Sequence, residues 1–220
     1  MAKLAELGFS KNVITEAIVS TYNMDGQPNA APMGVTLESA RSIAIRPYVS
    51  THTSENLQLK KCAVINVTSN PEIFYRTAFK EANPEGRIPL GWFQRAETVD
   101  APRMRMADAT IEVELRDARE IDEERINALC QVKLIRASKV LPQVYCRALY
   151  AVIESVVHST RIKVLIGDDS EQKRVQRLVD TINENSYLVK RVAPNSLYSE
   201  IMDVLNRRIE SWRVKSENPR

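Results

Sequence analysis

Residue types that build metal sites and nucleophilic centres are scarce in this chain. Its 220 residues include two histidines and three cysteines, and the cysteines stand far apart as Cys62, Cys130 and Cys146. This spacing does not match that of zinc ligands. An odd number of separated cysteines without a secretory signal favours reduced thiols. The sequence therefore predicts no metal centre and a cytoplasmic location.

Long apolar runs and familiar catalytic motifs are missing as well. No segment is long enough to span a bilayer, and the apolar stretch after Lys3 is too short for a signal peptide. There is no Gly-x-Ser-x-Gly elbow, P-loop or Gly-x-Gly-x-x-Gly motif. The net charge is only +3, with both signs mixed, which argues against nucleic acid as a partner. These absences favour a bound cofactor over catalysis by side chains.

The clearest pattern that is present predicts a β-hairpin near the N-terminus. Residues 13–22 alternate as a strand does, and Asp25-Gly26 supplies a tight turn. The following strand, residues 28–35, carries almost no charge and several small side chains. Small residues leave the backbone bare, so a flat ring could lie against this strand and hydrogen-bond to its main chain. Close packing within the sheet is the alternative explanation.

Hydroxyl groups crowd the predicted start of a helix that runs to Lys61. Four of the five residues from Ser50 to Ser54 carry a hydroxyl. A helix start offers free N–H groups and the positive end of the dipole, which suit a phosphate, and Arg46 on the preceding strand would add charge. Helix capping by Ser or Thr explains one hydroxyl but not four. Phosphate binding and ordinary capping both remain open from these residues.

The rest of the chain divides into a strand-rich part and a helical part. Further strands are predicted over 42–48, 62–68, 104–115 and 126–135, with a helix as the competing interpretation of the last, and a helix over 71–80. Residues 81–103 lack periodicity; Trp92 and Phe93 at their centre either anchor this segment or close over a ligand. Three helices follow, with apolar stripes over 149–157, 175–182 and 197–212.

Three motifs together carry a family resemblance. They are Thr-Tyr-Asn-x-Asp-Gly-x-Pro-Asn-Ala-Ala-Pro-Met-Gly-Val ending at Val35, the Thr-rich turn with its downstream Asn-Leu and Ala-Val-Ile-Asn-Val, and residues 146–161. The chain resembles the FMN-binding split-barrel superfamily of flavin reductase-like proteins over about residues 13–165. It is most similar to a largely archaeal subgroup that has a C-terminal helical extension.

This resemblance implies an α+β fold. Residues 1–140 would form an antiparallel, Greek-key-like split barrel that binds FMN, and residues 141–220 a helical extension that packs on the barrel or on a dimer partner. The isoalloxazine ring would lie against Ala31, Pro32, Met33, Gly34 and Val35. The phosphate would lie in the turn formed by Ser50, Thr51, His52, Thr53 and Asn56. Relatives often carry Lys or Arg where this chain has His52, so positive charge would come from Arg46, from backbone N–H groups or from another basic residue such as Arg147.

The resemblance also implies an activity. FMN would bind in a cleft between the subunits of a homodimer and accept hydride from a reduced nicotinamide or a small substrate, with no dedicated catalytic side chain. One alternative is a deazaflavin coenzyme on the same fold. Another is a flavin-binding or structural dimer without catalysis. Neither nucleic acid nor a membrane is an expected partner.

Overall fold

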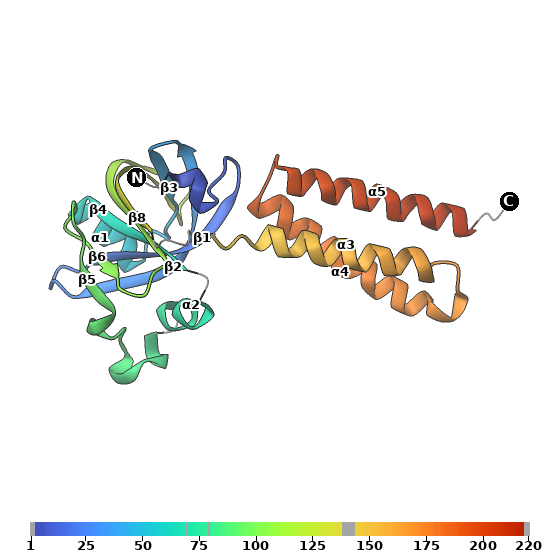
Figure 1. Cartoon of the computed structure of the whole chain (residues 1–220), viewed down its shortest axis with the longest axis horizontal. Coiled ribbons are helices and arrows are strands. Elements are labelled where there is room, and N and C mark those ends of the chain that lie inside the picture. Colours follow the sequence, from blue (N-terminus) through green and yellow to red (C-terminus); the bar gives the residue numbers. More distant parts are fainter. Residues whose placement is uncertain (1–2, 69, 79, 138–143, 218–220) are drawn as a thin grey trace. The chain divides into compact units, whose positions relative to one another are not determined.

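The computed structural model describes residues 3–68, 70–78, 80–137 and 144–217 (Figure 1). It divides into two compact units, residues 1–145 and 146–220, where the sequence predicts a boundary after residue 140. The first unit contains the strands, and the second contains three long helices.

Six strands of the first unit form a closed antiparallel barrel in the order β1-β2-β3-β8-β7-β4. Their bounds are β1 Ile14–Tyr22, β2 Pro28–Ser39, β3 Ser42–Ile45, β4 Cys62–Val67, β7 Ala109–Glu120 and β8 Ile126–Ala137. Together with the helices of the second unit they confirm the predicted α+β fold of an antiparallel barrel with a C-terminal helical extension. The competing helix over 126–135 is wrong, because alternate residues Ile126, Ala128 and Cys130 point into the barrel core.

The β1–β2 hairpin forms where the sequence predicts it. The Asn23 N–H donates to the Gln27 carbonyl at 2.9 Å, and the Asp25 side chain accepts from the Gln27 N–H at 2.9 Å. Gly26 has a φ of 77°, a left-handed value that glycine adopts without strain. The turn chemistry of Asp25-Gly26 therefore sets the register in which Val19 pairs with Ala31.

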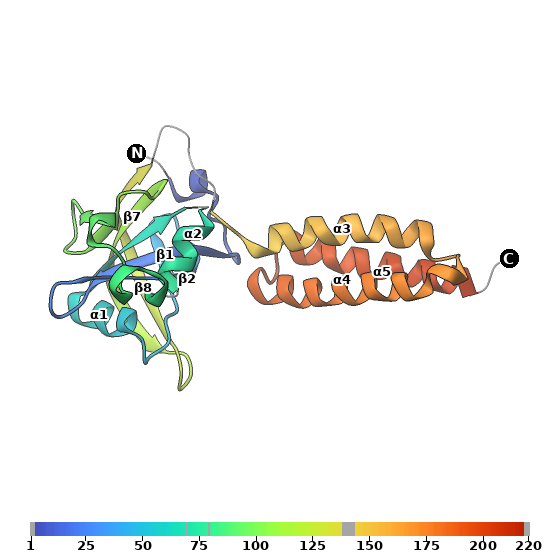
Figure 2. The same ribbon diagram turned by 90° about the horizontal axis from the view of Figure 1, so that it is seen from below.

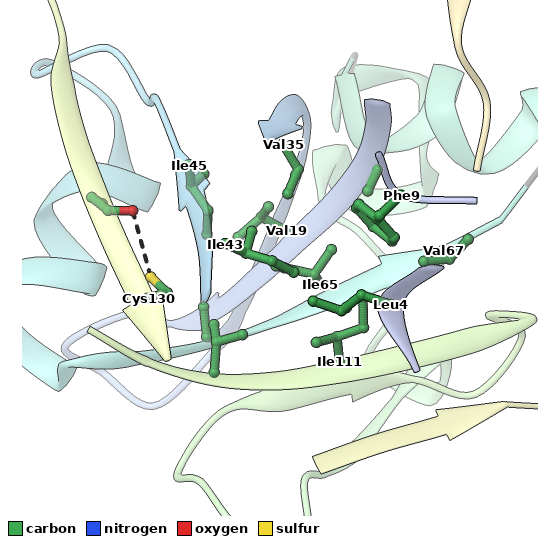
Figure 3. Close-up of a cluster of buried hydrophobic side chains, with 14 of the residues drawn as sticks. Leu4, Phe9, Val19, Val35, Ile43, Ile45, Ile65, Val67, Ile111 and Cys130 are labelled. Carbon is green, nitrogen blue, oxygen red and sulfur yellow. Dashed lines mark hydrogen bonds between the residues drawn. The ribbon is translucent and has the colours of Figure 1, made fainter. Parts of the chain in front are cut away.

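The barrel core is made by the inward-facing residues of all six strands. Val19, Val35, Ile43, Ile65, Ile111 and Cys130 meet there, together with Leu4 of the short helix η1 (Leu4–Leu7) and with Phe9 (Figure 3). Leu57 of α1 (His52–Lys60) is also fully buried in this cluster. The helix that begins with the hydroxyl-rich turn is thus fixed to the barrel by its own apolar side chain.

A second apolar cluster fixes the connection between β4 and β7. The helix α2 (Pro71–Ala78) is followed by η2 (Lys80–Ala82), η3 (Pro84–Gly86) and η4 (Leu90–Trp92), and then by the small hairpin of β5 (Phe93–Arg95) and β6 (Pro102–Met104). Phe93 and Met104 are buried against Ile18 and Ala30 on the outer side of β1 and β2, and Trp92 packs on them. This packing favours the anchoring role of Trp92 and Phe93.

Two strand predictions need correction. The strand predicted over 42–48 ends at Ile45, and the strand predicted over 104–115 is broken between Met104 and Ala109. The break has a clear cause: the Met104 N–H donates to the side chain of Asn66 at 2.8 Å rather than to a neighbouring strand. Residues 105–108 then turn the chain from β6 into β7.

All three cysteines are free and buried. Burial raises the pKa of the Cys130 thiol to about 12 and also raises the pKa of Cys62. The raised pKa keeps the Cys130 thiol in its un-ionised form at pH 8, and the thiolate is the reactive form. We therefore expect Cys130 to resist Ellman's reagent in the native protein, with three thiols titrating after unfolding in guanidinium. Rapid reaction of Cys130 in the native state, identified by peptide mapping, would contradict this packing.

The second unit consists of α3 (Arg147–Leu165), α4 (Gln172–Val192) and α5 (Leu197–Glu217), which lie side by side (Figure 2). The three predicted helices are confirmed. Polar contacts join them inside the bundle: Asn185 of α4 donates to Ser155 of α3, and Asn206 of α5 donates to Ser186 of α4. No helix among the described residues is long and apolar enough to cross a membrane.

Candidate functional site

The hydroxyl-rich turn begins α1, as the sequence predicts. Thr51 caps the helix, because its Oγ1 accepts from the Ser54 N–H at 3.3 Å and donates to the Tyr48 carbonyl at 2.8 Å. Within the described residues, the N–H groups of His52 and Thr53 have no acceptor. These two amides lie at the positive end of the helix dipole, so the turn can accept an anion.

Two buried side chains of α1 tie this turn to the β1–β2 hairpin. Thr53 Oγ1 accepts from Asn29 Nδ2 at 3.2 Å, and Asn56 Nδ2 donates to Thr21 Oγ1 at 3.0 Å and to Asn23 Oδ1 at 2.8 Å. Both N–H groups of Asn56 are therefore used in holding the hairpin. Thr53 still has its own hydroxyl proton to donate. Both side chains therefore position the turn, and both are almost fully buried, Thr53 at 2% and Asn56 at 3% exposure.

A basic residue that the sequence interpretation missed joins the same group. Lys80 of η2 donates from Nζ to Asn29 Oδ1 at 2.5 Å, while Nδ2 of that same amide donates to Thr53. The lysine is half-buried, and this burial lowers the pKa of its ammonium group. In the sequence Lys80 is only the last residue of a predicted helix, standing 51 positions after Asn29. No local pattern distinguishes it from a surface lysine.

The predicted ring-binding strand has one unpaired edge. β1 pairs with β2 along residues 28–36, but β3 pairs with β2 only from Val35 onward. Among the residues that the structure describes, Ala31–Gly34 is thus paired on its β1 side alone. Backbone N–H and C=O groups on the other side have no neighbouring strand in the described part of the chain, although α2 packs against β2, so they can bind a ligand or a partner chain.

Several residues of the predicted ring-binding strand are explained by packing rather than by exposure of the backbone. A Cβ atom on Gly34 would lie 2.6 Å from Cγ2 of Ile14 on the neighbouring strand, so Gly34 is required by close sheet packing. Val35 is fully buried in the barrel core and paired on both sides, which removes it from the open edge. Ala30 is covered by the Phe93 cluster. The accessible part of the predicted surface is therefore Ala31, Pro32, Met33 and Gly34, all partly buried.

Four predicted phosphate residues lie elsewhere or point outward. Arg46 donates to Asn127 at 3.2 Å and pairs with Glu38 at 3.9 Å, so its described contacts are not with α1. Ser50 is exposed, and the side chain of His52 is 73% exposed with Nδ1 3.5 Å from Glu55. The last, Arg147, begins α3 in the second unit. The structure thus unites Thr51 and Thr53 with the start of β2, but supplies Lys80 as the nearby cation.

Two hollows in the described surface contain none of the predicted residues. One of about 200 Å³ lies beside β6, β7 and β8 and includes Arg103, Thr110 and Arg136. The other, of about 570 Å³, lies in the second unit and includes Gln172 and Arg213. The predicted site is instead the open edge of β2 with the α1 turn at its start. Within the part of the chain that the structure describes, no three His, Cys, Asp or Glu residues are grouped to hold a metal.

Sequence profiles identify both parts of the chain. The N-terminal domain profile of a protein of unknown function, DUF447, matches residues 15–138. The DUF447 profile itself matches residues 146–207. A search of curated proteins found no match.

Solved structures show the same fold. An FMN-bound DUF447 protein from Methanosarcina mazei superposes with a TM-score of 0.53 at 23% identity, covering 93% of this chain and 98% of that one. A candidate flavin reductase with a split-barrel domain from Shewanella frigidimarina superposes with a TM-score of 0.51 at 13% identity, covering 58% of this chain and 68% of that one. Sequence identities this low demonstrate the fold alone, and the fold is a split barrel with a helical extension.

Proposed function

Because the chain belongs to the DUF447 family, we propose that it is an FMN-binding flavoprotein that acts as an oxidoreductase. The observation that carries this proposal is the likeness to a DUF447 protein that holds FMN, which extends over 93% of this chain and 98% of that protein. Whether the residues of the β2 edge and the α1 turn suit FMN is a separate question, which depends on this chain alone.

The residues of the β2 edge and the α1 turn fit the two ends of FMN. The free amides of His52 and Thr53 at the start of α1 are donors that suit a phosphate. From Asn29, which bonds to Thr53, the strand runs about 13 Å to Met33 at ~3.3 Å per residue. FMN has a phosphate at one end of a ribityl chain and a flat ring at the other. The elongated arrangement of donors and open strand suits such a ligand.

When bound, FMN would supply the capacity to accept hydride from a reduced nicotinamide or a small substrate. The protein's own part is to bind and orient. The open backbone edge of Ala31–Gly34 offers hydrogen bonds to a flat heterocycle, and the start of α1 holds the anionic end. Because FMN would supply the redox chemistry, no acidic or basic side chain is required at this site for proton transfer.

We also propose that the protein is a homodimer in which the partner chain closes the open edge of β2. Unpaired strand edges are normally covered, and Ala31–Gly34 is partly exposed in the single chain. The three free cysteines fit a reducing, cytoplasmic environment. Light scattering after size exclusion should give twice the 25.0 kDa chain mass. A monomer that still binds FMN would disprove the shared site.

The visible spectrum of the purified protein tests the cofactor. We expect bound or added FMN at one per chain, identified by the mass of the released chromophore, and rapid bleaching by a reduced nicotinamide without oxygen. A released chromophore with the mass of a deazaflavin would identify that coenzyme, rather than FMN, as the ligand. Bound FMN that no nicotinamide reduces would favour a flavin-binding protein without this activity. Protein that is folded but takes up no flavin would refute the proposal.

A further inference from the structure

We propose that Lys80 is the counter-ion of the FMN phosphate and makes the site select phosphorylated flavin over riboflavin. This inference rests on the proposed function and assigns the source of positive charge at that site. It adds a residue from η2 to a phosphate site otherwise built by α1 and β2.

The first argument is that the charge of Lys80 is uncompensated. Its side chain is half-buried, and desolvation is the one cause that shifts its pKa, with no carboxylate contributing. Within the described residues its one polar contact is the neutral Asn29 side chain. Partly buried ammonium groups are normally paired, since desolvation disfavours the charged form. A bound phosphate would provide the missing negative charge.

The second argument is the path from Lys80 to the helix start. Asn29 Oδ1 accepts a hydrogen bond from the Lys80 ammonium group, and Asn29 Nδ2 donates to Thr53 Oγ1 at 3.2 Å. One amide group therefore separates the lysine from the second residue of α1. Because the Thr53 oxygen already accepts from Asn29, its proton is directed away from Asn29, although the residue is only 2% exposed. The ammonium group is thus joined through one amide to the helix start that carries the unbonded N–H groups of His52 and Thr53.

The third argument is that the other basic candidates of the first unit are engaged elsewhere. Arg46 bonds to Asn127 and pairs with Glu38, and the largely exposed His52 lies beside Glu55. Lys80 has no such acidic partner among the described residues. Lys80 therefore brings positive charge toward the turn from another element, η2.

Paired titrations with FMN and riboflavin test this assignment on the full-length protein. Lys80→Met removes the charge at similar length, and we expect it to weaken FMN binding by about 10- to 100-fold while leaving riboflavin affinity unchanged. Lys80→Arg should retain most of the FMN preference. Lys60→Met, at the exposed opposite end of α1, changes the net charge equally and should leave both affinities as they are.

A second variant keeps the test decisive if Lys80→Met folds poorly. Lys80→Gln also removes the charge but keeps an N–H donor for Asn29 Oδ1, and it leaves the Asn29–Thr53 bond in place. FMN affinity should fall and riboflavin affinity should not. Equal losses for both flavins, or no loss of FMN affinity in Lys80→Met, would overturn the assignment of Lys80 while leaving the proposed function intact. Wild-type protein that binds neither flavin would instead overturn the proposed function and this inference with it.

Discussion

Replacement of Asn66 by alanine is expected to lower the free energy of unfolding by about 3 kcal/mol. Asn66 is fully buried in β4, where Nδ2 donates to the Ile18 carbonyl at 3.0 Å and to Ser20 Oγ at 2.8 Å. Its Oδ1 accepts from the Met104 N–H at 2.8 Å. Alanine would leave the buried Met104 N–H without this acceptor and remove the amide donor from Ile18, while Ser20 Oγ would keep its bond to the Pro102 carbonyl. Losing such buried bonds is more harmful than losing an exposed hydrogen bond.

The effect is best measured by urea unfolding in a Trp212→Phe background. Trp92 then reports on the barrel alone, because Trp212 belongs to the second unit. Glu123→Ala, in the exposed turn between β7 and β8 of the same unit, is the control and should change the midpoint little. A loss below about 1 kcal/mol for Asn66→Ala would mean that water replaces the missing amide and that Asn66 does not fix β6.

Replacement of Gly34 by alanine is expected to lower the free energy of unfolding by about 2 kcal/mol. The added Cβ would lie 2.6 Å from Cγ2 of Ile14, a branched methyl group that can move away only if the stiff β-branched side chain changes its χ1 rotamer. The same substitution at Gly91, where no atom lies within 4 Å of the added Cβ, should be close to neutral. Urea midpoints of the two variants provide the comparison.

The double variant Ile14→Ala with Gly34→Ala separates packing from flavin binding. Removing the Ile14 methyl group should recover at least about 1 kcal/mol relative to the sum of the single effects. If FMN also lies on this strand, its affinity should remain reduced in the double variant. Simple additivity of the two stability effects would show that the close approach of Ile14 is not the reason for glycine at position 34.

Several parts of the fold could be read directly from local sequence. Asp25-Gly26 predicted the hairpin turn, and alternation along residues 13–22 predicted β1. Thr51 and its neighbours predicted the start of α1. These features depend on residues that are close in sequence, because backbone conformation, side-chain periodicity and helix capping are decided within a few positions.

Other features depended on partners that are distant in sequence. Asn66 belongs to an apolar strand, and nothing in that strand shows that its amide would stop β6 at Met104. The same dependence on distant partners holds for the basic candidates. The position of Arg46 before the turn predicts a phosphate ligand, but its contacts are with Glu38 and Asn127.

The sequence by itself determined the hairpin, the bare strand and the hydroxyl-rich helix start, since each follows from short-range periodicity and turn chemistry. Only the tertiary structure decided that the open edge of β2 ends before Val35, and that Lys80 reaches Asn29 across 51 positions. The physical reason is that a polar side chain is satisfied by whichever group packing brings beside it. Closure of the barrel brings α1 and η2 to the same end of β2, and no local sequence pattern predicts that these two elements lie together.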